Sequence, residues 1–269
     1  MAEKTILLTG AAGTAASMLR PLMRADYRLR LLDREPVPDP SEGEEVVTAD
    51  LADFNSVASA VKGVDGIVHL GAYSVEGPWE VILQSNIIGT YNVFEAARRL
   101  DVKRVVFASS NHVVGFYRRE QKIGVDVTVR PDSRYALSKC LGEALGSLYA
   151  DKYGAEVLCI RIGNVEHKPL DVRRLAIWIS PRDLCQLVRL GLELPGLRYE
   201  IVYGMSDNAR AWWDNSNALR LGYRPQDRAE DYAAEVLASD PQSPGDDLVV
   251  DRQGGNFVRV ESGGDPWKQ

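Results

Sequence analysis

Cysteine and histidine are scarce in this chain of 269 residues, which has three of each. The cysteines, Cys140, Cys159 and Cys185, lie far apart and form neither a CxxC pair nor a Cys/His spacing typical of a metal site. We therefore expect reduced thiols that serve packing, in a cytoplasmic protein without a metal centre.

Long hydrophobic runs are missing as well. No segment approaches the roughly 18–20 apolar residues needed to span a bilayer. Near the N-terminus the apolar core runs only from Ile6 to Leu8 before Thr9 and Gly10 interrupt it, so we expect no targeting segment. The net charge of −6 argues against nucleic acid and anionic membranes as partners, because both carry negative charge themselves.

Short apolar runs alternate with amphipathic stretches over the first two thirds of the chain. Strands are predicted at 5–9, 28–33, 66–71, 104–109 and 156–161, and helices at 13–25, 54–62, 79–99 and 133–152. This alternation is typical of an α/β fold with a doubly wound parallel sheet. The strand ends of such a sheet gather at one edge, where ligands bind.

The alternation fades after about residue 162. We expect residues 163–269 to form a small C-terminal lobe and tail that pack on residues 1–162 as one unit. Within this lobe, 209–223 is predicted to be helical. The end of the chain, from Ser239 onward, is rich in Pro, Gly and Asp and is predicted to be irregular.

A glycine-containing turn, Gly10-x-x-Gly13-x-x-Ala16, follows the first strand. Such a turn lets a pyrophosphate approach backbone amides at the start of the next helix, although many glycine turns are only turns. About 20 residues later the second strand ends in Asp33, where a carboxylate can bind a ribose and repel a 2′-phosphate. Together these features predict a Rossmann-type core that prefers NAD, while the adjacent Arg34 leaves NADP open.

Further residues at this edge are candidate cofactor contacts. Asp50 and Leu51 follow a third strand and are placed at the adenine. Besides the residues of the glycine turn and Asp33, the candidate cofactor contacts are Ala12, Thr14, Asp50, Leu51, Leu70, Gly71 and Ala72. Tyr135 and Lys139 are expected at the other end of the cofactor.

Helix 133–152 begins with Tyr135 and Lys139, which are spaced i, i+4 and so share one helix face. A phenol has a reference pKa of about 10, and a nearby cation is needed to make it a base near neutral pH. The preceding strand ends in four hydrogen-bonding residues, from Ser109 through Ser110 and Asn111 to His112. Polar residues often cap strand ends, but this run also suits a reaction centre.

The segments TGAAGTAAS, ADLAD, HLGAYS, NIIGTYNV, FASSNH and YALSK occur in the order seen in the extended short-chain dehydrogenase/reductase superfamily, which the chain resembles over nearly its whole length. Within it, the stretches from Gly66 to Asn92 and from Val105 to Tyr117, with RIGN and AWWDNS, resemble most the uronate dehydrogenases. The chain departs from the family pattern at Ala16, where the superfamily has glycine, and at Asn164, where serine is usual.

The resemblance implies roles for individual residues. Tyr135, Lys139, Ser110 and Asn86 would be catalytic, with Asn86 organising a proton-relay water unless it only bonds to backbone. Ser109 is expected to face the fold. The substrate contacts implied are Ser74, Ser110, Asn111, His112, Tyr135, Asn164, Arg173 and Phe257.

Among these contacts, a planar guanidinium suits a carboxylate, so Arg173 is expected to bind it and Arg174 to be solvated. Phe257 is expected to close over the site, or else to anchor the tail. His112 has a simpler alternative as a histidine satisfied by backbone.

The expected activity is NAD-dependent oxidation of the C1 hemiacetal of a hexuronic acid to an aldarolactone, by a homo-oligomer. A nucleotide-sugar epimerase or dehydratase of the same fold is the nearest alternative, but would need a larger C-terminal lobe. A non-catalytic NAD(H) sensor is the other, although it would need none of Ser110, Tyr135 and Lys139. Galacturonate and glucuronate both remain candidate substrates.

Overall fold

A parallel sheet forms the centre of the molecule, as predicted, and it has seven strands. The computed structural model describes residues 4–239 and 247–260. The strand order is β3-β2-β1-β4-β5-β6-β9, and every neighbouring pair is parallel. The strands are β1 (Thr5–Thr9), β2 (Arg28–Asp33), β3 (Glu45–Thr48), β4 (Gly66–His69), β5 (Arg104–Ser110), β6 (Glu156–Ile162) and β9 (Tyr199–Gly204).

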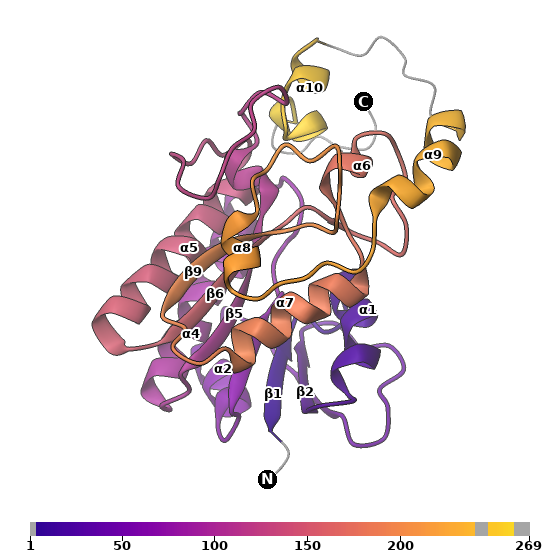
Figure 1. The fold of residues 1–269 in the computed structure, drawn as a ribbon. Helices are drawn as coiled ribbons and strands as arrows, with labels where there is room; N and C mark the ends of the chain where they lie inside the picture. Colours follow the sequence, from indigo (N-terminus) through magenta and orange to yellow (C-terminus); the bar gives the residue numbers. More distant parts are fainter. Residues whose placement is uncertain (1–3, 240–246, 261–269) are drawn as a thin grey trace.

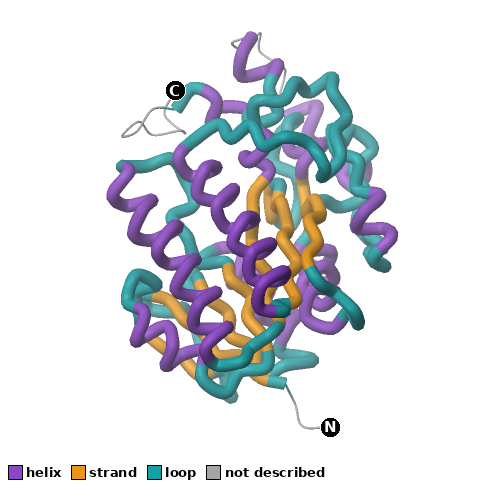
Figure 2. The backbone as a smooth tube through the Cα atoms, turned by 90° about the vertical axis from the view of Figure 1, so that its left-hand side faces the viewer, coloured by secondary structure: helices purple, strands orange, loops and turns teal. Residues whose placement is uncertain are grey.

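Helices cover both faces of this sheet. Alternate residues of one strand point to opposite faces, so Ile6 and Leu8 of β1 pack in one hydrophobic cluster and Leu7 packs in another. Figure 1 shows α1 (Thr14–Met23) and α7 (Pro181–Glu193) on the nearer face. On the other face lie α2 (Phe54–Val61), α4 (Gly89–Arg99) and α5 (Arg134–Tyr153), which stand before the strands in Figure 2.

The helix predicted at 79–99 is continuous, but it changes from α-helix to π-helix and back to α-helix. It consists of α3 (Trp79–Ile82), the π-helical η1 (Leu83–Ile88) and α4. Asn86 lies within the π-helical turns. A π-helical insertion is rare and often occurs near a functional site.

Residues after 162 contribute both to the sheet, through β9 and α7, and to the region beyond the carboxyl ends of the strands. Several short elements form that region, away from the N-terminus in Figure 1. They are η2 (Asn111–Val114), β7 (Asn164–Val165), α6 (Arg174–Ile177), β8 (Trp178–Ile179), η3 (Ala229–Tyr232), α9 (Ala233–Ser239), α10 (Asp247–Asp251) and η4 (Gly255–Val258). The short helix α8 (Ser216–Arg220) lies instead beside β9, where Asn217 donates to the carbonyl oxygen of Ile201. No helix among the described residues is long and apolar enough to cross a membrane.

Two predictions for this region are wrong. Of the helix predicted at 209–223, only α8 forms, because Trp213 and Asn215 are held by contacts with β9. The tail predicted to be irregular contains α10 and η4, which pack against the rest of the chain. The parts of the tail at 240–246 and 261–269 lie outside the described residues.

Candidate active site

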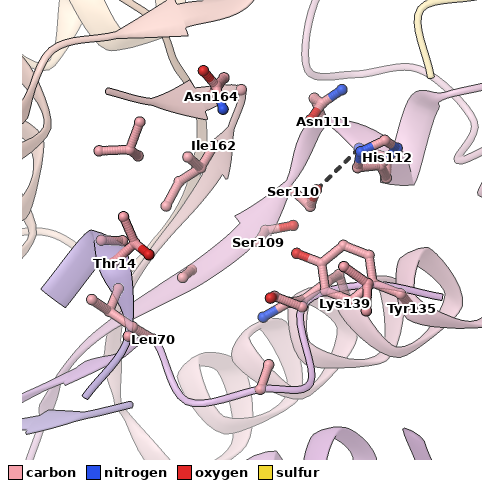
Figure 3. Close-up of a pocket in the computed structure, with 18 of the residues that line it drawn as sticks. Thr14, Leu70, Ser109, Ser110, Asn111, His112, Tyr135, Lys139, Ile162 and Asn164 are labelled. Carbon is pink, nitrogen blue, oxygen red and sulfur yellow. Dashed lines mark hydrogen bonds between the residues drawn. The ribbon is translucent and has the colours of Figure 1, made fainter. Parts of the chain in front are cut away.

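A cavity of about 1240 Å³ lies at the carboxyl ends of the strands. All residues predicted to contact cofactor or substrate line it, except Ala12 and Asn86. Figure 3 shows Thr14 and Leu70 on one side of this space, with Tyr135, Lys139, Asn111 and His112 on the other. The cavity thus connects the glycine turn to the start of α5.

The turn after β1 is built for close approach of a ligand. Gly10 has φ of +71°, and a Cβ on it would lie 2.7 Å from the Cα of Gly71, so no larger residue fits without strain. Gly13 caps α1 without a side-chain hydrogen bond, which leaves the first-turn N–H groups for an anion. These features fit the pyrophosphate of a dinucleotide.

Asp33 stands at the end of β2, at the predicted position. Its Oδ2 accepts a hydrogen bond from the N–H of Ala12 at 3.0 Å, and its Oδ1 accepts one from the N–H of Glu35 at 3.0 Å. Ala12 therefore lies behind the cavity wall and orients the carboxylate. Two oxygens held in this way can still accept hydrogen bonds from ribose hydroxyls.

Tyr135 and Lys139 occupy successive turns at the start of α5. The hydroxyl of Ser133 caps this helix by accepting the N–H of Ala136 at 3.1 Å. Burial raises the pKa of Tyr135 to about 12, against the opposing effect of a hydrogen bond with Ser110. Burial also lowers the pKa of Lys139 to about 7. Each side chain alone thus favours its neutral form, and each would be stabilised as an ion by the other.

The two serines at the end of β5 point in different directions. Ser109 donates to Oε1 of Glu143 at 2.6 Å inside the fold, as predicted. Glu143 in turn forms a buried ion pair with Arg161, at 2.9 Å. Ser110 lines the cavity beside the phenol, since its side chain acts to lower the pKa of Tyr135.

Asn86 does not reach the cavity. Its Nδ2 donates to the carbonyl oxygen of Tyr73 and to Oγ of Ser138, both at 3.0 Å, and its Oδ1 accepts the N–H of Tyr73 at 2.7 Å. Asn86 therefore ties the segment after β4 to α5. Its relay role stays a prediction, since both amide hydrogens are already used.

Three aromatic rings meet at the substrate end. Phe257 stacks on His112 with centroids 3.9 Å apart, and His112 contacts Tyr135 edge-on at 6.1 Å. Nδ1 of His112 lies 2.7 Å from Oδ2 of Asp132, so the partner of His112 is a carboxylate and not backbone. Phe257 thus lies against His112 and near Tyr135, and its closure over the site stays a prediction.

At three of the predicted substrate contacts, a buried polar atom of the cavity wall has no hydrogen-bond partner among the described residues. These atoms are Nδ2 of Asn111, Oδ1 of Asn164 and Nε of Arg173. Leaving a buried donor or acceptor unpaired costs about 1–3 kcal/mol, so such groups usually pair with a ligand or with ordered water. Two donors and one acceptor around one space suit a polyhydroxylated acid. Ser74, by contrast, lies exposed at the rim.

Arg173 lines the cavity with a guanidinium whose Nε is buried. Its Nη2 donates to the carbonyl oxygen of Gln253 at 2.6 Å. Burial lowers the pKa of Arg173 to about 10, and the positive charges of Arg119 and Arg174 act in the same direction. A bound carboxylate would relieve both effects. The prediction that Arg174 is solvated is wrong, because it pairs with Asp171 and its side chain is only 17% exposed.

Sequence reasoning missed four residues around this site: Arg119, Glu76, Asp132 and Gln253. Arg119 lines the cavity and donates to the carbonyl oxygens of Arg252 and Val249, both at 3.0 Å. The signal available in the sequence was the pair Arg118 and Arg119, which follows shortly after β5. The carboxylate of Glu76 accepts the N–H groups of Arg134 and Tyr135, at 2.7 and 3.3 Å, and so anchors the helix that carries the phenol.

Comparison with known proteins agrees with this geometry. Residues 6–177 match the family described as NAD dependent epimerase/dehydratase, and the chain belongs to that family. Within it, the chain groups with the uronate dehydrogenases. It is 47% identical over 255 residues to one from Pseudomonas putida, covering 94% of this chain and 95% of that protein.

Solved structures agree in the same way. The crystal structure of uronate dehydrogenase from Agrobacterium tumefaciens superposes with a TM-score of 0.93 at 44% identity, covering 97% of this chain and 98% of the other. A tyrosine-to-alanine mutant of that enzyme, complexed with NAD, gives the same TM-score at 43% identity, with the same coverage.

Proposed function

We propose that this chain oxidises C1 of a hexuronic acid, such as galacturonate or glucuronate, to the aldarolactone with NAD. The observation that carries the proposal is one cavity lined by Tyr135, Lys139 and Ser110 together with Arg173, whose Nε has no hydrogen-bond partner among the described residues. Relatives at 44–47% identity that are named uronate dehydrogenases support it.

The cofactor half of the cavity suits NAD. Gly10 and Gly13 give access to backbone N–H groups for the pyrophosphate. Asp33 would bind the ribose and repel a 2′-phosphate. The rest of the lining, Thr14, Asp50, Leu51, Leu70, Gly71 and Ala72, would complete the site. When bound, NAD accepts the hydride that leaves C1.

The chain itself moves the proton. Tyr135 as phenolate takes the proton of the C1 hydroxyl, while Ser110 holds that hydroxyl beside it. Lys139, buried next to the phenol, supplies the positive charge that makes the phenolate accessible near neutral pH. Burial of the whole group strengthens this charge interaction, since little water screens it.

The substrate half binds the sugar through groups that lack partners in the protein. Arg173 would receive the carboxylate through its Nε–H. The amide of Asn111 would donate to one sugar oxygen, and the amide oxygen of Asn164 would accept from a hydroxyl. His112 and Ser74 would complete the ring of polar contacts, with Phe257 as an apolar wall. The parts of the chain after residue 162 that lie beyond the strand ends would thus act as a small substrate lobe, while β9 and α7 belong to the NAD-binding core.

The compartment and the oligomeric state of the enzyme are inferred from its cysteines and from its surface. Three free cysteines support a reducing, cytoplasmic compartment. Tyr91 on α4 is 46% exposed, and Leu137, Leu141 and Leu148 on α5 are at least 36% exposed. We infer that this apolar face joins copies of the chain in a homo-oligomer.

A direct assay tests the function. The absorbance of reduced nicotinamide is followed with NAD and, in parallel, galacturonate, glucuronate, free hexoses and a nucleotide sugar. We expect turnover with a uronate and little with free hexoses. Turnover with the nucleotide sugar alone would indicate an epimerase or dehydratase relative instead. NAD binding without turnover on any sugar would indicate a sensor.

A further inference from the structure

The carboxylate of Asp132 is buried beside the reaction centre but is not part of the proton or hydride chemistry. Its side chain is 0% exposed. Oδ2 lies 2.7 Å from Nδ1 of His112, and Oδ1 accepts the hydroxyl of Ser133 at 2.9 Å. No Lys or Arg of the described residues forms a salt bridge with it. Its charge acts to raise the pKa of nearby Arg173, but the contacts of its oxygens are hydrogen bonds, and the one at His112 couples these two side chains tightly.

The contact between Asp132 and Nδ1 of His112 determines which ring nitrogen of His112 carries the hydrogen. A carboxylate only accepts, so Nδ1 must carry the hydrogen, and Nε2 of the neutral ring is then an acceptor. His112 lines the cavity and lies beside Tyr135. We propose that Asp132 is a positioning residue that holds His112 in the Nδ1–H tautomer, so that Nε2 accepts a hydrogen bond from a substrate hydroxyl. This inference rests on the proposed function.

The packing around Asp132 couples it to the tail of the chain as well. A Cβ on Gly115 would lie 1.9 Å from Oδ2, and one on Gly254 would lie 2.1 Å from it. The N–H of Gly254 also donates to the carbonyl oxygen of Gly115 at 2.9 Å. Both glycines therefore close tightly over the carboxylate.

Three residues beyond Gly254, Phe257 stacks on the face of His112 at 3.9 Å. The imidazole is thus held at its edge by Asp132 and on its face by Phe257. Because the tail docks on the same carboxylate that orients the ring, the two restraints act together. In the alternative tautomer Nε2 would carry the hydrogen and Nδ1 would turn a lone pair toward the carboxylate, so the hydrogen bond to Asp132 would be lost.

The tautomer can be measured on the wild-type chain without any variant. The ring-nitrogen NMR spectrum has to resolve only three histidines, His69, His112 and His167. We expect His112 with hydrogen on Nδ1, in the presence of NAD. Assignment to the Nε2–H tautomer would overturn the proposal, whatever the variants do.

Kinetics then test the function of the contact. Asp132→Asn keeps the shape but removes the charge, and Asp126→Asn, an exposed acid of the same loop, is the matched control. At saturating NAD, we expect Asp132→Asn to lower kcat/KM for the uronate by roughly 10- to 100-fold. The Kd for NAD should stay within about twofold, and Asp126→Asn should match wild type.

A double variant separates positioning from a general structural role. If Asp132 acts through His112, Asp132→Asn should add less than about threefold to the loss caused by His112→Ala. The proposal would be overturned if the two single-variant losses in kcat/KM multiplied in the double variant, or if Asp132→Asn alone kept the wild-type kcat/KM. Absence of uronate turnover in the wild type would instead reject the proposed function, and leaves the NMR result to decide the tautomer.

Discussion

The ammonium nitrogen of Lys139 lies 5.6 Å from the centre of the Tyr135 ring, and both side chains are at most 8% exposed. No carboxylate of the described residues forms a salt bridge with Lys139. Its charge is therefore available to the phenol. The first two predictions follow from this pair.

Replacement of Tyr135 by Phe should nearly abolish turnover, because it removes the proton acceptor and leaves the ring packing unchanged. General-base contributions are typically about 10²–10⁴-fold, and we expect a loss of kcat in that range. Steady-state kinetics and an NAD titration measure the two effects. Activity within a factor of three of wild type would exclude the phenol as the base.

Replacement of Lys139 by Met should shift the pH profile of kcat/KM upward. The phenol of Tyr135, whose pKa burial raises to about 12, is ionised more easily while the neighbouring cation is present. Without that cation, oxidation should lose activity near neutral pH and regain part of it as the pH rises. The profile is measured with wild type and variant in the same buffers. An unchanged profile with lower amplitude would mean that Lys139 only positions ligands.

The NAD preference should depend on Asp33. Its carboxylate, fixed by the N–H groups of Ala12 and Glu35, lies where a 2′-phosphate would be repelled. Asp33→Ala should reduce the ratio of kcat/KM for NAD over NADP by about ten- to a hundredfold, as a lost charge-assisted contact implies. Kinetics with both cofactors decide this, and a wild-type enzyme that prefers NADP would contradict it from the start.

The fold and the placement of Tyr135 beside Lys139 could be predicted because their signals are local. Alternating strands and helices, the turn at Gly10 and the i, i+4 spacing of Tyr135 and Lys139 each lie within a few residues of sequence. The same holds for Asp33, which ends a strand. Each pattern decides one element without knowledge of the others.

The wall of the substrate site could not be predicted in this way. Gln253 contacts Arg173 across 80 residues and Gln121 across 132 residues, and Trp213 donates to its side chain across 40 residues. Such contacts fix a tail whose composition favours irregular structure. They also explain why 209–223 is not one helix, since Trp213 stacks on Tyr203 with ring centres 4.8 Å apart.

Arg173 should distinguish a uronate enzyme from a general sugar dehydrogenase. If its guanidinium binds the substrate carboxylate, Arg173→Lys should not restore activity, because an ammonium cannot reproduce the planar donor. Hydrogen bonds to charged groups contribute about 1.5–3 kcal/mol, so we expect a ten- to a hundredfold loss, mainly in KM. Binding that is equal in ground and transition states leaves kcat nearly unchanged.

The decisive measurement compares wild type and Arg173→Ala, each with galacturonate and with galactose. Galactose lacks the carboxylate, so it should already be poor with wild type, and the variant should not make it worse. Equal losses on both sugars would mean that Arg173 supports the fold, for example through its bond to the carbonyl oxygen of Gln253. In that case Arg119, which lines the same cavity, becomes the next carboxylate-binding candidate, since Arg174 is already paired with Asp171.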